Sequence, residues 1–153
     1  MNQADGSGIE TPELDNTASL TLLFALGKAA LKCHLRMDED LRPLGMSTAK
    51  LEVLVQLLRA GESLPLRVLA ERQQCVPSNM TTLVDRLEAD GLVRRVDDPA
   101  DRRSKRAELT PEGEEKARAG SAQLLALSER FDQLLGERGQ HSLAQALAQL
   151  SEL

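Results

Sequence analysis

Residues Asp97–Gly113 read DDPADRRSKRAELTPEG, and this stretch decides the fold. Arginines and lysines crowd around an Asp-Pro turn. Thr110 then supplies a helix cap and Pro111 opens the helix, because proline suits the first helical position, where its missing N–H has no partner to lose. Upstream, residues 79–96 read NMTTLVDRLEADGLVRRV, an amphipathic helix pattern that stops at Gly91 and continues as a strand pattern. The chain therefore runs helix, strand, basic hairpin tip, strand, helix.

This order of elements is that of a winged helix-turn-helix. We expect its second helix, the recognition helix, over about residues 77–90 and a two-stranded wing over about 92–109. The only aromatic residues are Phe24 and Phe131, so the core must be built from Leu, Ala and Val, which suits packed helices better than a large sheet. The predicted fold class is mainly α with a small β wing (α+β).

The spacing of apolar residues predicts further elements on either side of this lobe. Leu51, Leu54, Val55 and Leu58 are expected to form the buried stripe of a helix capped by Ser47. The other expected elements are a long helix over 18–41, an extended piece at 64–65, a short helix over 66–74, a long helix from 111 to about 135, a break at 136–140 and a final amphipathic helix.

Composition limits the classes of protein that fit. Hydrophobic residues make up 41% and charged residues 28% of the 153 residues, and no uninterrupted apolar run reaches the roughly 18 residues of a membrane span. The first residues are neither basic nor apolar, so we expect no signal peptide and a cytoplasmic protein without a membrane partner. In that compartment Cys33 and Cys75 are expected to be free thiols.

The net charge of −5 conceals a local excess of positive charge. Residues 94–106 hold six basic side chains against three acidic ones, a net of +3. Charges more than about 8 Å apart are largely screened at physiological salt, so phosphate attraction depends on this local balance. An acidic protein with a basic wing is therefore compatible with DNA binding.

The helix expected from Pro77 carries polar side chains that can recognise duplex DNA. Its apolar stripe leaves Asn79 and Arg86 on the outward side, and these residue types pair bidentately with adenine and guanine. Ser78 can bind a phosphate, and the methyl groups of Thr81 and Thr82 can contact thymine. The alternative interpretation is a solvated helix face, or a winged helix that contacts a protein partner instead of DNA.

Three spaced motifs, LVDRLEADGLV, DPADRR and LTPEG, closely resemble the MarR family of bacterial transcriptional regulators. The resemblance implies a DNA-binding regulator, most often a repressor. It also implies that Asp101 orients an arginine, Arg102 or Arg103, which enters the minor groove. Lys105 belongs to the positive field of the wing, and we expect it to contact DNA as well.

The same resemblance implies a homodimer on a pseudo-palindromic operator, held together by helices from both chain ends. The alternative is that the C-terminal leucines cover their own subunit. The resulting division is a flexible segment over 1–16, an N-terminal dimerisation helix over 17–45, a DNA-binding lobe over 46–110 and C-terminal dimerisation helices over 111–153.

Two kinds of signal could act on such a regulator. Resemblance to the family suggests a small anionic or aromatic effector bound near Leu31, His34, Met46 and Leu51. The competing hypothesis is a thiol switch at Cys75, in the turn before the recognition helix, where a helix N-terminus can lower the pKa of a thiol.

No pattern for catalysis, metal binding or cofactor binding is present in the sequence. His34 and His141 lie in different expected helices without partners at metal-ligand spacing, and there is no glycine-rich phosphate loop or nucleophile elbow. We therefore expect no enzyme, no catalytic residue, no metal and no cofactor.

Overall fold

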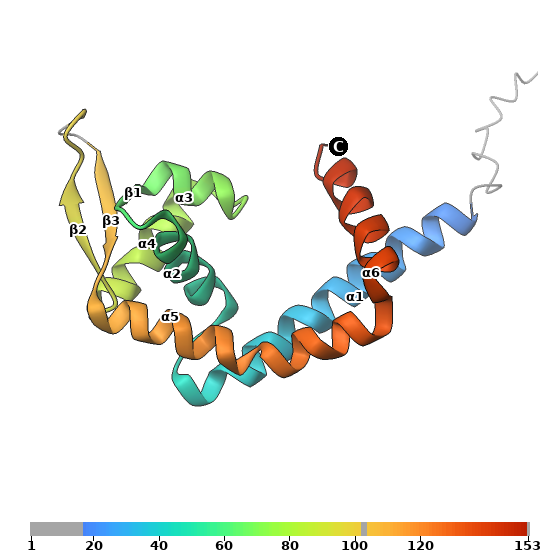
Figure 1. Cartoon of the computed structure of the whole chain (residues 1–153). Helices are drawn as coiled ribbons and strands as arrows, with labels where there is room; N and C mark the ends of the chain where they lie inside the picture. Colours follow the sequence, from blue (N-terminus) through green and yellow to red (C-terminus); the bar gives the residue numbers. More distant parts are fainter. Residues whose placement is uncertain (1–16, 102–103, 153) are drawn as a thin grey trace, which may run out of the picture. The chain divides into compact units, whose positions relative to one another are not determined.

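The computed structural model describes residues 17–101 and 104–152, which form a mainly helical chain with a small antiparallel sheet (Figure 1). The predicted fold class is confirmed. In chain order the elements are α1 (Thr17–Leu41), the 3-10 turn η1 (Arg42–Leu44), α2 (Thr48–Ala60), β1 (Leu64–Pro65), α3 (Leu66–Arg72), α4 (Pro77–Ala89), β2 (Val93–Asp97), β3 (Lys105–Leu109), α5 (Pro111–Gln123) and α6 (Leu125–Leu150).

The chain divides into two compact units, residues 1–34 and 35–153. The first unit, described from Thr17, is the N-terminal part of α1, and its leucines from Leu20 to Leu31 include several exposed ones. The second unit contains the end of α1 and everything that follows. Its boundary falls inside α1 because Leu41 is fully buried in the core of the second unit.

The core of the second unit is aliphatic, as the composition predicted. Both phenylalanines in the chain are exposed or outside this core. Each fully buried leucine contributes about 1.5–3 kcal/mol of hydrophobic free energy. The residues buried to 1% exposure or less are Leu41, Val53, Leu54, Leu57, Leu69, Met80, Val84, Leu87, Ala107 and Ala117.

Helix α2 is buried over a wider arc than its predicted stripe. Leu51 and Leu54 are buried as expected, but Val53 and Leu57 are buried too, and Val55 is only partly so. The reason is that α2 packs against α4, α5 and β3 rather than against one neighbour. Its start is fixed by the Ser47 hydroxyl, which accepts a hydrogen bond from the Lys50 N–H.

The wing belongs to a three-stranded sheet rather than the predicted two-stranded one. The strand order is β1-β3-β2, and both pairings are antiparallel. In the β2–β3 pairing Arg94 lies opposite Glu108 and Arg95 opposite Ala107. The added strand is the predicted extended piece, whose Pro65 is tolerated because β1 is an edge strand.

The predicted single helix from 111 to about 135 is wrong, because α5 ends at Gln123. Leu124 packs against the core, and its N–H lies between the Gly120 and Ala122 carbonyls, so the turn tightens there. This tertiary contact leaves no mark in the local sequence. The break expected after residue 135 is confirmed at Gly136, whose φ of 61° and ψ of 172° are not helical.

Among the described residues, one segment, Ala18–Leu44, is long and apolar enough to cross a membrane, judged by length and composition alone. Its most apolar window has a mean hydropathy of 1.2, and none of that window is buried within the chain. Lys28 and Lys32 interrupt the apolar run. A helix that is covered by a second protein chain has the same character.

Gly113 allows the first turn of α5 to lie directly against Leu92, at the base of the wing. A Cβ at this position would meet the Leu92 carbonyl oxygen at 1.9 Å, far inside any real contact distance. The glycine of the LTPEG motif is therefore required because two backbone segments pack closely there, not because a turn needs a positive φ.

We predict that Gly113→Ala destabilises the protein by about 1–3 kcal/mol or more, because the new methyl group forces α5 away from Leu92. Urea denaturation followed by circular dichroism measures the change. Glu115→Ala is the control. Glu115 is an exposed residue of the same helix, so alanine should change stability by no more than about 0.5 kcal/mol. Equal stabilities of the two variants would contradict the packing argument.

Candidate nucleic-acid interface

One side of helix α4 is buried in the core, and the opposite side is exposed to solvent. Met80, Val84 and Leu87 have no exposed surface, so they fix the rotation of the helix about its axis. The helix begins at Pro77, as the sequence predicted. The side chains that the sequence marked as DNA contacts are all exposed: Ser78, Asn79, Thr81, Thr82 and Arg86.

These exposed side chains differ in how much hydrogen-bonding capacity they retain. The Thr81 hydroxyl donates to the Pro77 carbonyl at 3.0 Å, and the Thr82 hydroxyl donates to the Ser78 carbonyl at 3.1 Å. Their methyl groups and oxygen lone pairs stay available. Within the described part of the chain, the Arg86 guanidinium has no hydrogen bond or ion pair, so all of its donors are free for a ligand.

A hollow of about 390 Å³ lies beside this face of α4. Asn79, Thr82 and Arg86 line one side of it, and Cys75 borders it from the turn before the helix. The remaining lining comes from α2, from α4 itself and from the end of α3, where the Gln73 side-chain amide donates to the Ala49 carbonyl at 3.1 Å.

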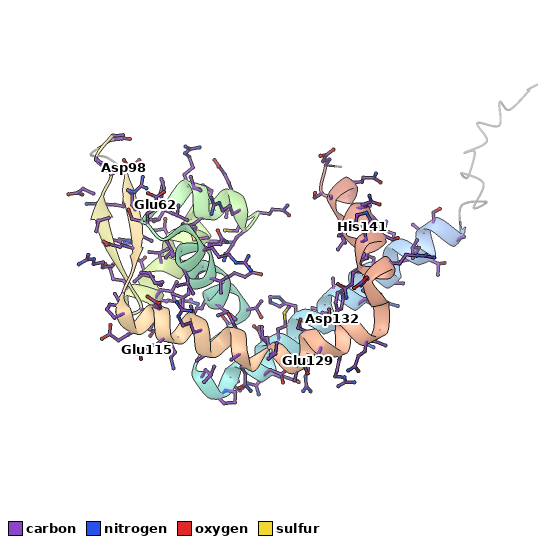
Figure 2. All side chains as sticks on the ribbon, viewed as in Figure 1. Glu62, Asp98, Glu115, Glu129, Asp132 and His141 are labelled. Atoms are coloured by element: carbon purple, nitrogen blue, oxygen red, sulfur yellow. The ribbon has the colours of Figure 1, made fainter. Side chains whose placement is uncertain are left out.

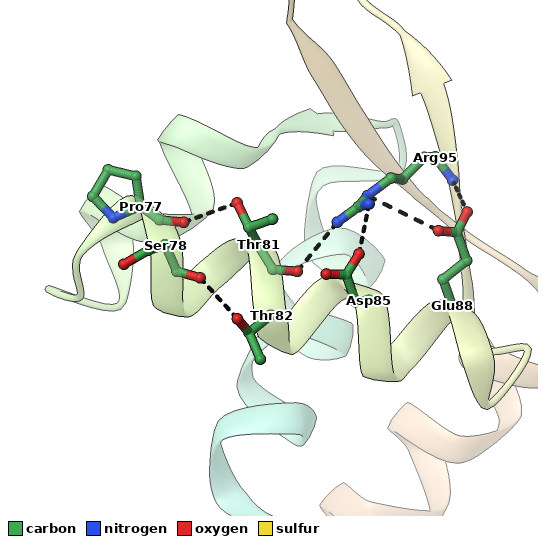
Figure 3. A network of polar contacts seen from close by, with 7 residues as sticks. All are labelled: Pro77, Ser78, Thr81, Thr82, Asp85, Glu88 and Arg95. Carbon is green, nitrogen blue, oxygen red and sulfur yellow. Dashed lines mark hydrogen bonds and ion pairs between the residues drawn. The ribbon is translucent and has the colours of Figure 1, made fainter.

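Arg95 links the wing to α4 (Figure 3). Its guanidinium forms an ion pair with Asp85 at 2.6 Å and donates to the Thr81 carbonyl at 3.1 Å. Its main-chain N–H donates to the Glu88 carboxylate at 2.9 Å. The sequence did not reveal this link, since Thr81, Asp85 and Glu88 lie fourteen, ten and seven positions before Arg95.

The strands of the wing are joined by two further ion pairs. Arg94 donates to both carboxylate oxygens of Glu108, at 2.8 and 3.0 Å. This bidentate hydrogen bond lowers the pKa of Glu108 and raises the pKa of Arg94. Near the tip, Lys105 forms an ion pair with Asp97. Both pairs are largely exposed to solvent, so each contributes little to folding stability.

Asp98 organises the tip of the wing, where Figure 2 labels it. Its carboxylate accepts a hydrogen bond from the Ala100 N–H at 2.9 Å, and Arg106 lies 3.4 Å from its other oxygen. The Ala100 hydrogen bond is the main cause that lowers the pKa of Asp98, and Arg106 adds to it against the opposing effect of burial. Arg106 also donates to the Ser63 hydroxyl at 2.9 Å, which ties the wing to the turn before β1.

The pairing of these side chains revises the predicted positive field of the wing. The net charge of +3 over residues 94–106 stands, but Arg94, Arg95, Lys105 and Arg106 each face a carboxylate. Arg94, Arg95 and Arg106 therefore hold the wing together as well as supplying charge. Lys105 keeps 53% of its side chain exposed.

The predicted tip is described only in part. Asp101 accepts hydrogen bonds from Ser104, at 2.8 Å on its carbonyl and at 3.2 Å on its carboxylate. Arg102 and Arg103 lie outside the described residues. The proposed orientation of an arginine by Asp101 therefore remains a prediction from the sequence.

The predicted effector residues fall in different parts of the chain. Leu31 and His34 are exposed in the N-terminal unit, whereas Met46 and Leu51 are buried in the second. Leu51 borders a cavity of about 310 Å³ in the second unit, which the sequence did not reveal because its walls come from distant segments. The lining residues are Met37, Thr48, Leu51, Glu52, Val55, Gln56, Arg59 and Leu124.

Neither a disulfide nor a metal cluster accompanies these features. Cys33 and Cys75 are both free thiols, as predicted, and Cys75 packs partly against the core. Among residues 17–101 and 104–152, no group of three His, Cys, Asp or Glu side chains could hold a metal ion.

A core-anchored helix with a free polar face, beside an antiparallel wing, defines a winged helix-turn-helix protein. The MarR family model matches residues 46–105. The HTH-type transcriptional repressor MdtR of Bacillus subtilis is 33% identical over 121 residues, which cover 79% of this chain and 77% of the repressor. The chain belongs to the MarR family of transcriptional regulators.

Solved structures of MarR-type regulators have the same fold. The regulator Sco3205 from Streptomyces coelicolor, in complex with DNA, is 27% identical with a TM-score of 0.84, covering 94% of this chain and 91% of its own. CouR from Rhodococcus jostii RHA1, bound to p-coumaroyl-CoA, is 27% identical with a TM-score of 0.77, covering 84% and 90%.

Proposed function

We propose that this regulator is a cytoplasmic, non-enzymatic repressor that binds a pseudo-palindromic operator in duplex DNA as a homodimer. The observation that carries the proposal is the open face of α4, where Asn79 and Arg86 are exposed while the opposite side is locked in the core. A helix held in this way presents its N-terminal half to the major groove. Binding of DNA by the similar regulator Sco3205 supports the assignment.

Individual residues take different parts in the proposed contact. Arg86 has the free donors to pair with the N7 and O6 acceptors of guanine, and Asn79 suits adenine. Ser78 lies in the first turn of the helix, where phosphate contacts set the register, and Thr81 and Thr82 present methyl groups that can contact thymine. On the wing, Lys105 and the sequence-predicted Asp101, Arg102 and Arg103 complete the site.

The alternative is a winged helix whose α4 face contacts a protein. Salt dependence separates the two functions, because a DNA binder that makes several phosphate contacts loses affinity steeply between low and moderate salt. A protein interaction through exposed polar groups would show no preference among duplex sequences.

We predict that Arg86→Ala lowers affinity for the operator by about 1–3 kcal/mol and relaxes preference at one base-pair position. Fluorescence anisotropy on a duplex selected from a randomised pool, and on its single-base variants, measures both effects. Arg118→Ala is the control, because Arg118 is another exposed arginine, on α5, and it pairs with Glu114. Unchanged discrimination in Arg86→Ala would remove Arg86 from the recognition surface.

Exposed apolar residues on α1 and α6 support the homodimer. Leu23 and Phe24 on α1 are 57% and 61% exposed, and Phe131 and Leu147 on α6 are each 45% exposed. A single soluble chain rarely leaves so many large apolar side chains uncovered along two helices. A second copy that covers these surfaces accounts for them and for the membrane-like composition of α1.

We predict that Leu147→Glu shifts the protein from dimer to monomer and weakens operator binding at least about tenfold, because burying an unpaired carboxylate in an apolar contact is unfavourable. Sedimentation velocity and anisotropy report the two effects. Gln149→Glu adds the same charge at an exposed polar position of α6 and should remain dimeric. A dimeric Leu147→Glu would place the interface elsewhere.

The cavity beside Leu51 is the best candidate for an effector site. Met37, Val55 and Leu124 give it apolar walls, and its charged lining residues are the cation Arg59 and the anion Glu52. The Gln56 Oε1 atom is buried without a hydrogen-bond partner among the described residues, so a ligand donor could satisfy it. Binding of p-coumaroyl-CoA by the similar protein CouR supports regulation by an organic anion.

We predict that an aromatic carboxylate that releases the wild type from its operator must be raised about tenfold in concentration to release Arg59→Ala, since a charge-assisted contact is lost. Titration of protein–operator complexes with a panel of such acids measures this, and Arg118→Ala again serves as control. Identical release of both proteins by every active compound would exclude Arg59 from the effector site.

A further inference from the structure

The contacts of Arg95 with α4 involve three positions on one side of the helix (Figure 3). Thr81, Asp85 and Glu88 are separated by four and three residues, so a helix aligns them along a single stripe. The Arg95 guanidinium reaches the Thr81 carbonyl and the Asp85 carboxylate, and its Nε lies 3.9 Å from the Glu88 carboxylate. With the main-chain hydrogen bond to Glu88, one residue of β2 spans two turns of α4.

The Arg95 side chain is directed at the protein rather than at solvent. It is 26% exposed, whereas the side chain of Arg94, the preceding residue on the opposite face of β2, is 66% exposed. The Arg95 Nε atom is buried and has no hydrogen-bond partner in the described structure. Its two terminal nitrogens face the Thr81 carbonyl and the Asp85 carboxylate, so the guanidinium is placed to contact α4 rather than a phosphate.

The negative charge of Asp85 is unexpected on a DNA-binding helix. It lies on the helix that is proposed to enter the major groove, and its side chain is 54% exposed. A carboxylate in this place repels the phosphate backbone of any duplex. Glu88, 42% exposed, adds a second negative charge on the same stripe. Considered by charge alone, both residues oppose the proposed function.

We propose that Arg95, Asp85 and Glu88 form a helix–wing clamp that fixes the wing relative to α4, and that Arg95 is a positioning residue for operator recognition. The inference rests on the proposed DNA-binding function. Residues 90–92 connect α4 to β2 and fix only the base of the wing, whereas Arg95 holds β2 against α4 beyond that connection. Simultaneous contact with a major and a minor groove requires a fixed separation between helix and wing, which the rigid fork of an arginine can set.

The clamp and simple electrostatics predict opposite results for Asp85→Asn. If charge alone matters, the variant binds every duplex more tightly. If the clamp positions the wing, affinity for the operator falls about tenfold, the effect of losing one charge-assisted hydrogen bond, while affinity for an unrelated duplex is unchanged or rises. Anisotropy titrations on a selected duplex and a scrambled duplex of equal length, at one salt concentration, give the ratio of the two affinities.

Asp97→Asn is the matched control. It also removes one carboxylate from an ion pair of the DNA-binding lobe, but its partner Lys105 is an exposed residue of the wing and no contact to α4 is lost. This variant should bind both duplexes equally or more tightly, with the ratio preserved. Asp85→Glu keeps a carboxylate at the clamp and should restore part of the ratio that Asp85→Asn loses.

Two variants of Arg95 test the partner side of the clamp. Arg95→Lys keeps the positive charge but lacks the planar fork that contacts the Thr81 carbonyl and the Asp85 carboxylate together, so it should lower the operator-to-scrambled ratio as Asp85→Asn does. In the double variant Asp85→Asn/Arg95→Gln, the losses should not add. A plain phosphate contact by Arg95 would instead lower binding to both duplexes equally and reduce the salt slope by about one.

The outcomes separate the clamp from the function on which it rests. A wild-type protein that prefers no duplex sequence overturns the proposed function. A wild type that selects an operator, together with a folded Asp85→Asn variant that binds it more tightly and with undiminished discrimination, overturns the clamp alone. Thermal unfolding shows whether each variant is folded. If Asp85→Asn does not fold, an Arg95→Lys variant with the wild-type ratio of affinities overturns the clamp instead.

Discussion

The burial of one side of α4 is the constraint on which the rest of the structure depends. Met80, Val84 and Leu87 are fully buried, and rotating the helix would expose them at roughly 1.5–3 kcal/mol each. The opposite side is therefore presented in one orientation only. Base recognition requires side chains that are held in a fixed position. The buried side of α4 therefore allows the free donors of Arg86 and the exposed amide of Asn79 to contact bases specifically.

The basic residues of the wing have structural roles that a count of charges does not show. A net of +3 suggests a surface designed for phosphates, yet the structure uses Arg94 to join two strands and Arg106 to tie the wing to Ser63. These arginines make specific hydrogen bonds, so their loss would alter geometry as well as potential. The attraction of DNA then depends more heavily on the few cations that keep free donors, Arg86 among them.

The sequence predicted what depends on local pattern and missed what depends on distant contacts. The Thr-Pro start of α5, the Gly136 break and the start of α4 at Pro77 are local signals of capping, backbone conformation and proline geometry, and each was predicted correctly. The turn at Leu124 and the pairing of β1 with β3 arise from tertiary packing, which no local period encodes. In the site, exposure of the α4 side chains followed from the stripe opposite, whereas the partners of Arg95 and the cavity beside Leu51 did not.

The junction between α4 and α5 explains how a signal elsewhere in the second unit could reach the DNA-binding face. The Thr110 hydroxyl accepts from the Gly113 N–H as a helix cap and donates to the Gly91 carbonyl at 2.8 Å, so the start of α5 is joined to the end of α4. Gly113 lies against Leu92 with no space between them, which leaves this joint little freedom. A displacement of α5 must therefore move α4 rather than bend the connection. Because the wing is also held to α4 through Arg95, helix and wing would move together. In the proposed homodimer, such a movement would change the spacing between the two DNA-binding lobes, and only one spacing would fit the operator.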